Sequence, residues 1–201
     1  MANRFRELSL SNVKYHSGLH QSTKLNEKAV LVQKVLGLQE VQKFSQNRQL
    51  VLDGITKNVY AHTPKFTVVI PVEPAEDNGH VSSSESLMVF VDPAASIFTV
   101  KLLSITADKL AGTMTFSLAN PDGTNAVAST FDQSFREIAK EQSSDIAVQE
   151  TFSQCLKRLW GNLPWWLQAA CAGSCGACFG LNPAACAVCA GCIGGNAIDC
   201  I

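Results

Sequence analysis

Hydrophobic and polar positions follow two different periods along the chain. Between residues 26 and 44, apolar residues recur mostly at three- and four-residue intervals, with charged residues on the opposite side. This period predicts an amphipathic helix, whose middle is weakened by Gly37. From residue 58 to residue 131 the period falls to two, which is typical of strands with one buried face.

Four or five strands are expected in the second region. The runs that indicate them are 66–72, 87–91, 97–105, 113–118 and 125–130. Asp92-Pro93 and Asn120-Pro121-Asp122-Gly123 supply turn residues between the runs. The acidic and serine-rich stretch 73–85 is expected to be an exposed loop. We therefore predict an α+β fold, in which the N-terminal helix packs on an antiparallel meander of four or five strands.

The helical period returns after the meander. Phe131, Phe135 and Ile138 fall on one stripe, and Ser143-Ser144-Asp145 can cap a further helix. The serine-rich break at 142–145 is the expected boundary between two units. The predicted organisation is a flexible arm over 1–22, an α+β leader domain over 23–142 and a cysteine-rich helical domain over 143–201.

Charge is distributed unevenly, although the chain of 201 residues has a net charge of only −1. Residues 1–65 carry ten basic and four acidic side chains, whereas residues 66–150 carry four and twelve. We expect these two halves to pair within the fold. The small net charge argues against a nucleic-acid partner.

All eight cysteines fall within the last 47 residues. They are Cys155, Cys171, Cys175, Cys178, Cys186, Cys189, Cys192 and Cys200. The even number of cysteines and their density in this short segment favour disulfide bonds. Cys171, Cys175 and Cys178 share one face of a helix, as do Cys186, Cys189 and Cys192. A helical hairpin that turns at 180–183 would pair Cys178 with Cys186, Cys175 with Cys189 and Cys171 with Cys192, and would leave Cys155 and Cys200 as an outer pair.

The alternative use of these cysteines is metal binding, in an intracellular module whose cysteines hold zinc or an iron–sulfur cluster. Cys171-x3-Cys175-x2-Cys178 has the spacing of a radical iron–sulfur motif, and Cys186-x2-Cys189-x2-Cys192 begins like a ferredoxin run. The large barrel and the close fourth cysteine that those sites use are missing, so we expect no metal or other cofactor. A third possibility is a surface structural protein in which cysteines cross-link neighbouring chains.

Three tryptophans precede the cysteine cluster. Trp160, Trp165 and Trp166 follow Lys157-Arg158, and tryptophan beside basic residues suits a membrane interface. We therefore take them as candidate membrane-contact residues, with coverage of the junction between the two units as the alternative. The first residues contain no apolar stretch of signal-peptide length. If the chain is secreted, we expect a route other than the Sec pathway.

Together, the charged leader, the tryptophan-rich junction and the terminal Ala/Gly/Cys segment resemble the halocin-like cysteine-rich bacteriocin precursors. This resemblance implies a secreted antimicrobial peptide at the C-terminus, constrained by disulfides and active on the target-cell membrane or envelope. It implies a leader that shields the peptide or confers immunity, and a dedicated exporter and peptidase as partners. The sequence lacks the usual hydrolase and phosphate-binding motifs, so we expect no enzymatic activity.

Overall fold

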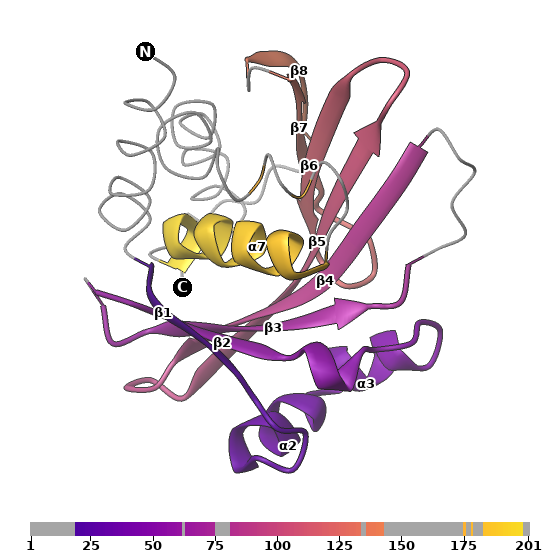
Figure 1. Ribbon diagram of the computed structural model, residues 1–201. Helices are drawn as coiled ribbons and strands as arrows, with labels where there is room; N and C mark the ends of the chain where they lie inside the picture. Colours follow the sequence, from indigo (N-terminus) through magenta and orange to yellow (C-terminus); the bar gives the residue numbers. More distant parts are fainter. Residues whose placement is uncertain are drawn as a thin grey trace.

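The computed structural model describes residues 19–61, 63–74, 81–133 and 136–142, together with Cys175, Cys178 and residues 183–198. Its central feature is an antiparallel sheet of eight strands whose spatial order is the order of the sequence. The strands are β1 (Leu19–Lys24), β2 (Thr56–Tyr60), β3 (Phe66–Val72), β4 (Val81–Asp92), β5 (Ile97–Asp108), β6 (Thr113–Ala119), β7 (Val127–Asp132) and β8 (Glu137–Gln142). The strand direction turns steadily from β1 to β8, as in other twisted sheets (Figure 1).

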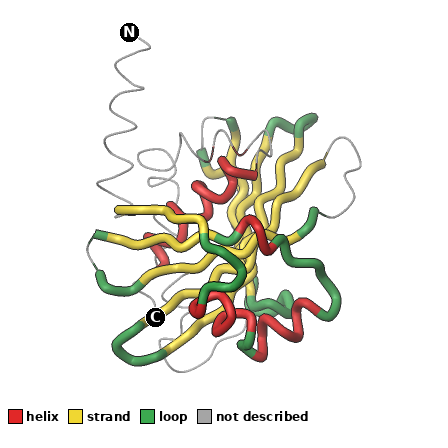
Figure 2. The backbone as a smooth tube through the Cα atoms, turned by 60° about the horizontal axis from the view of Figure 1, so that its bottom comes forward, coloured by secondary structure: helices red, strands yellow, loops and turns green. Residues whose placement is uncertain are grey.

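Helices cover both faces of the sheet (Figures 1 and 2). The helices α2 (Val30–Leu36) and α3 (Gln39–Ser45) lie on one face, and the short helix η1 (Leu52–Gly54) leads from them into β2. The helix α7 (Pro183–Ala197) lies on the other face. Each side has its own hydrophobic core, so the middle strands are buried on both faces.

The strand period assigns side chains to these two cores. In β3, Val68 and Ile70 pack toward α2 and α3, whereas Val69 packs toward α7. In β4, Met88 and Phe90 belong to the α7 side. Successive side chains of a strand point to opposite faces, so an uninterrupted apolar run is what a doubly covered strand requires.

The two turns expected from the sequence are present. The backbone N–H of Ala94 donates to the carboxylate of Asp92, and the N–H of Gly123 donates to the carbonyl oxygen of Asn120 at 2.9 Å. Gly123 has φ = +83°, a value that favours glycine. These turns join β4 to β5 and β6 to β7.

The expected fold, a helix on four or five strands followed by helices and a helical hairpin, is wrong. Among the described residues the sheet has eight strands, and α7 packs against one face of it. The helical region expected from residue 131 onward begins instead with strand, because residues 131–132 end β7 and residues 137–142 form β8. Phe131 is buried against Phe116 in the sheet core, whereas Ile138 is 56% exposed, so the apolar stripe of the expected helix does not exist.

Three further boundaries differ from expectation. The helix expected at 26–44 is divided, because Gly37 ends α2 and Leu38 is extended, with ψ = 137°. The loop expected at 73–85 becomes strand from Val81, because β4 pairs with β5 over its whole length. The polar strand β1 begins at Leu19, inside the segment assigned to the arm.

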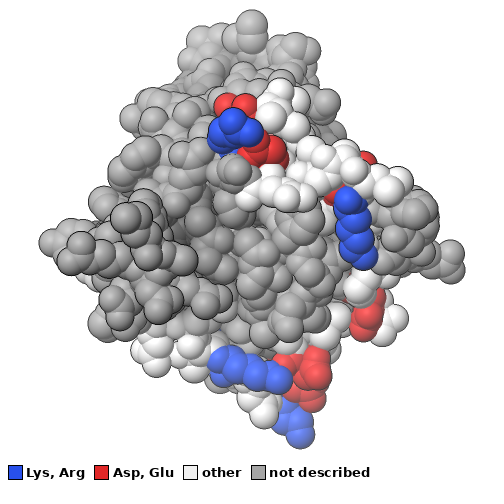
Figure 3. Space-filling view, turned by 45° about the horizontal axis from the view of Figure 1, so that its top comes forward, with Lys and Arg blue, Asp and Glu red and all other residues white. Residues whose placement is uncertain are grey.

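Ion pairs connect the basic and acidic parts of the sequence. Arg48 pairs with Glu85, and Lys65 Nζ lies 3.8 Å from Asp92 Oδ2. Each pair joins a residue before position 66 to one after it. Figure 3 shows described basic and acidic side chains lying beside one another on the displayed face. The uneven charge distribution is therefore used at least in part within the fold.

Candidate functional site: the seat of the cysteine-rich helix

The helix α7 is composed almost entirely of small and apolar residues. Its sequence is PAACAVCAGCIGGNA, without a charged side chain. Its described residues are buried except for Val188, which is 41% exposed. It shares one core with side chains from β2 to β7. This helix is therefore an internal layer of the molecule and not a surface element.

Two glycines allow α7 to approach the sheet closely. A Cβ atom on Gly191 would lie 3.1 Å from Asn58 Cγ. A Cβ atom on Gly194 would lie 2.7 Å from Met88 Cε and 2.9 Å from Tyr60 Oη. Glycine in a helix interior costs stability, so its use here is explained by the space that each missing side chain leaves for the sheet. We call the sheet residues Asn58, Tyr60, Thr67 and Met88 the helix seat.

A polar bridge crosses this otherwise apolar contact. Tyr60 Oη and Thr67 Oγ1 are 2.7 Å apart, and Tyr60 Oη donates to the carbonyl oxygen of Gly191 at 3.2 Å. A glycine carbonyl within a helix normally accepts only from its own helix, so the tyrosine adds a bond that fixes the axial position of α7. Desolvation by burial raises the pKa of Tyr60 well above its usual value, although the Thr67 hydrogen bond lowers it. The phenol therefore stays protonated and remains a donor.

The register of β2 and β3 assembles the bridge. Asn58 is the direct partner of Thr67 in this strand pair, and Tyr60 follows Asn58 on the same face. Asn58 Nδ2 lies 3.5 Å from Thr67 Oγ1, whereas Asn58 Oδ1 is buried and has no hydrogen-bond partner among the described residues. A buried polar atom without a partner is costly. Asn58 Oδ1 is such an atom, and it lies beneath Gly191. The seat therefore combines close packing with one buried oxygen that has no hydrogen-bond partner among the described residues.

Disulfides attach α7 to the segment before it. Cys175 is bonded to Cys189 and Cys178 to Cys186, with Cα separations of 4.7 and 4.6 Å. These are the two inner pairs of the ladder expected from the spacing, so the prediction of disulfide bonding is confirmed for these four cysteines. Their burial is complete or nearly so, and Cys192 is also disulfide-bonded and fully buried.

Several predicted site residues lie outside the described part of the chain. They are Cys155, Cys171, Cys200, Trp160, Trp165 and Trp166. Their expected roles stay predictions. Sequence reasoning missed the helix seat, whose only signal was the alternation of Asn58 and Tyr60 within a short strand.

Among the described residues, no group of three or more His, Cys, Asp or Glu side chains is arranged to hold a metal ion. None of the helices in this part of the chain combines the length and the apolar character needed to cross a membrane.

Comparison with known proteins gives no further identification. No protein-family profile matches the chain, and no curated protein or solved structure is significantly similar to it.

Proposed function

We propose that the chain is the precursor of a secreted, cysteine-rich antimicrobial peptide, and that the sheet shields this peptide until it is released. The peptide is the segment 143–201, which contains α7 and all eight cysteines. Its target is the membrane or envelope of another cell. Release and secretion would require a dedicated peptidase and exporter.

One observation carries the proposal: an uncharged, disulfide-bonded helix is held inside the molecule by a matched seat. An apolar helix such as α7 would present a large hydrophobic surface if it stood alone, and such surfaces bind membranes or other proteins. Burial of that surface against β2, β3 and β4 keeps the intact chain from making these contacts. Separation of α7 from the sheet would expose it.

The disulfides also favour this function over metal binding. Metal ions bind cysteine as thiolate, and the sulfur atoms of Cys175, Cys178, Cys186 and Cys189 are joined in pairs. A chain with oxidised cysteines fits an oxidising environment outside the cell.

The test uses the full chain with a specific protease site inserted after Ser143. We expect the intact, oxidised protein to be inactive against dye-loaded vesicles and sensitive bacteria, and the cleaved protein to cause leakage and growth inhibition. In a control protein the same site is inserted in the turn between β5 and β6, beside Leu110, which is 76% exposed. Cleavage there leaves 143–201 joined to β6–β8 and should release much less activity.

Three results would contradict the proposal. One is a cleaved, oxidised protein without effect on any membrane or cell tested. Another is full activity before cleavage. The third is protein that is isolated with free thiols and stoichiometric zinc or iron, which would support the metal alternative.

A further inference from the structure

The cysteines that the structure describes all lie in the core that α7 forms with the sheet. They are Cys175, Cys178, Cys186, Cys189 and Cys192, and each is buried. Side chains of the seat, among them Tyr60 and Met88, belong to the same core. The pairing of the cysteines and the packing of α7 on the sheet are therefore parts of one arrangement.

The spacing of the cysteines allows more than one ladder of disulfides. Cys186, Cys189 and Cys192 follow one another at intervals of three residues, and Cys178 follows Cys175 at the same interval. The observed ladder joins Cys178 to Cys186 and Cys175 to Cys189. Displacement of α7 by three residues, about 4.5 Å along its axis, would instead bring Cys189 to Cys178 and Cys192 to Cys175. Residue spacing alone does not select between these two ladders.

The fit of α7 on the seat does distinguish them. Residues three positions apart follow one another along one side of a helix, and on the side that meets the seat they are Val188, Gly191, Gly194 and Ala197. A Cβ atom in the place of Gly194 would lie 2.7 Å from Met88 Cε. The displaced ladder brings Ala197 to this place, and displacement in the opposite direction brings Val188 to the place of Gly191. Of these three registers, only the observed one has glycine at both places.

The same contact sets the rotation of α7 about its axis. Successive residues of a helix are turned by about 100°, so Cys189 lies about 160° from Gly191 and about 140° from Gly194. With both glycines against the sheet, Cys189 projects from the opposite side of the helix, where it is bonded to Cys175. Binding to the seat therefore fixes both the position of α7 along its axis and the direction in which its cysteines point.

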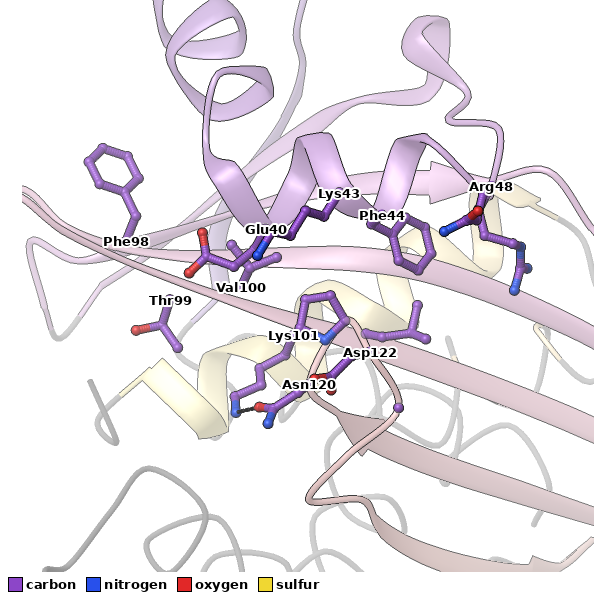
Figure 4. Close-up of a pocket in the computed structure, with 14 residues that line it drawn as sticks. Glu40, Lys43, Phe44, Arg48, Phe98, Thr99, Val100, Lys101, Asn120 and Asp122 are labelled. Atoms are coloured by element: carbon purple, nitrogen blue, oxygen red, sulfur yellow. Dashed lines mark hydrogen bonds between the residues drawn. The ribbon is translucent and has the colours of Figure 1, made fainter.

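The sheet does not need the cysteines for its own core. All described strands end before residue 143, whereas the first cysteine of the chain is Cys155. The core on the side of α2 and α3 is composed of residues between 25 and 102. Figure 4 shows this side, where Phe44 and Val100 lie beside a cleft of about 880 Å³. The seat can therefore exist before any disulfide forms.

The helix α7 is less well determined by its own sequence. It has glycine at three of its 15 positions, and a helix of this length is marginal in water without other support. We propose that the sheet is an intramolecular folding template, which binds α7 in one register while the cysteines are reduced and so selects the pairs that form disulfides. This role does not rest on the proposed antimicrobial function, because it concerns how the segment forms and not how it is used.

The oxidation step needs a small disulfide, such as oxidised glutathione, as the oxidant. One cysteine thiolate attacks it to give a mixed disulfide, and the thiolate of the cysteine that α7 has placed beside it displaces the second glutathione. Two cysteine thiols thus become one disulfide, and the oxidant takes up the two electrons and two protons and leaves as two thiols. The sheet supplies only the choice of the second cysteine.

The first test is oxidative refolding of the full chain. Reduced, urea-unfolded protein is diluted into a mixture of reduced and oxidised glutathione, and the pairs are identified by partial reduction, alkylation and mass spectrometry. The variant Gly194→Ala/Ala197→Gly keeps the composition and the cysteine spacing but exchanges the two residues that distinguish the registers. We expect the ratio of Cys178–Cys186 to Cys178–Cys189 to fall at least about fivefold from its wild-type value. An unchanged ratio would overturn the proposal.

Val188→Ala is the control for changes in the helix alone. Val188 is 41% exposed, and alanine there raises the helix propensity of α7 without touching the seat in the observed register. This variant should keep the wild-type ratio. A fall as large as in the double variant would show that any change in α7 alters the pairing, and would contradict selection by the seat.

A second measurement decides the question if the double variant does not fold. Wild type and Gly194→Ala are unfolded by urea with all thiols kept reduced, and the transition is followed by circular dichroism. If the seat binds α7 before oxidation, Gly194→Ala should have the lower midpoint in reducing buffer, whereas Gly37→Ala, which lies in α2, should not. Equal midpoints of wild type and Gly194→Ala, or a reduced wild type without a cooperative transition, would refute the template.

Discussion

Replacement of Gly194 by alanine tests whether the close approach of α7 to the sheet is essential. An alanine in place of a helical glycine normally stabilises the helix, by up to about 1 kcal/mol. Here the new Cβ would lie 2.7 Å from Met88 Cε and 2.9 Å from Tyr60 Oη. Met88 is fully buried, and Tyr60 Oη is held by Thr67 and by the Gly191 carbonyl. Tyr60 Oη cannot move away without lengthening these hydrogen bonds, whereas Met88 Cε is the end of a flexible side chain and can move only within the buried core.

The two effects oppose each other, and their sizes decide the sign. Overpacking of a well-filled core costs about 1–3 kcal/mol. After subtraction of the helix gain, Gly194→Ala should lower the free energy of unfolding by up to about 2 kcal/mol. For a chain of this size that corresponds to a decrease in Tm of roughly 4–8 °C. Urea unfolding of the oxidised protein, followed by circular dichroism, measures the free energy directly.

Gly37→Ala is the matched control. Gly37 ends α2 with φ = −79°, and a Cβ there would lie no closer than 3.4 Å to Gln33 O. This change should therefore be neutral or stabilise by about 0.4–1 kcal/mol. A Gly194→Ala protein as stable as the wild type would refute the reasoning about the seat.

A double variant identifies the contact that is responsible. Met88→Ala alone should be strongly destabilising because it leaves a cavity, by about 2–5 kcal/mol. It also removes the atom nearest to the new Cβ. The penalty for Gly194→Ala should therefore be smaller in the Met88→Ala background, and equal penalties in the two backgrounds would show that the clash is elsewhere.

The remaining predictions concern the phenol, a turn and the disulfides. Tyr60→Phe should cost about 0.5–1.5 kcal/mol at neutral pH. Because desolvation raises the folded-state pKa of Tyr60 above 10.0, its contribution is complete below about pH 10 and is lost at higher pH. Desolvation lowers the pKa of Lys101 from 10.5, and this change favours the folded state as the pH rises. The loss of stability caused by Tyr60 at alkaline pH should therefore be measured as a difference, by comparing the urea midpoints of wild type and Tyr60→Phe from pH 8 to 11. Gly123→Ala should destabilise by about 1 kcal/mol through backbone strain alone, because φ is +83° and no atom lies within 4 Å of the new Cβ; unchanged urea unfolding would contradict this. Finally, buried sulfurs should be reduced only after the molecule opens, so Gly194→Ala should be reduced faster than wild type, as measured by mass after alkylation; reduction of native protein as fast as of urea-unfolded protein would exclude this protection.

The strands that could be predicted are those whose pattern reflects their burial. β3 is apolar except for Thr67 because both of its faces are covered, and β6 alternates because one face is buried. The region after β6 misled the prediction, because Phe131, Phe135 and Ile138 recur at intervals of four and three residues, although Phe131 and Ile138 lie in strands. A bulge between Thr130 and Phe131 separates the parts of the β7–β8 pairing, and Ile138 points to solvent.

The polar strand β1 could not be found for a different reason. Its sequence, LHQSTK, has neither an apolar run nor strong alternation, so it contains no local signal of burial. Its pairing with β2 places it in the sheet. Edge strands of this kind are determined by the neighbour that they extend and not by their own hydrophobicity.

For the candidate site, the spacing of the cysteines was informative because disulfide geometry is local. Cys175 and Cys178 face Cys189 and Cys186 when helical turns run side by side, and this depends only on residue counts. The seat depends instead on the register of β2 with β3. A shift of one residue would turn Tyr60 to the other face of the sheet, and no count of residues within α7 reveals that register.

Gly191 and Gly194 of α7 lie where the disulfide-bonded helix meets the seat on the sheet. Taken alone, Gly191 and Gly194 weaken the helix, by up to about 1 kcal/mol each compared with alanine. Within the intact chain this cost is offset, because each glycine admits a side chain of the seat and Tyr60 binds the Gly191 carbonyl. A segment separated from the sheet would lose this compensation but would keep its disulfides. The helical form of α7 is therefore supported in the intact chain both by the seat and by the disulfides, and only the disulfides would remain in a segment separated from the sheet.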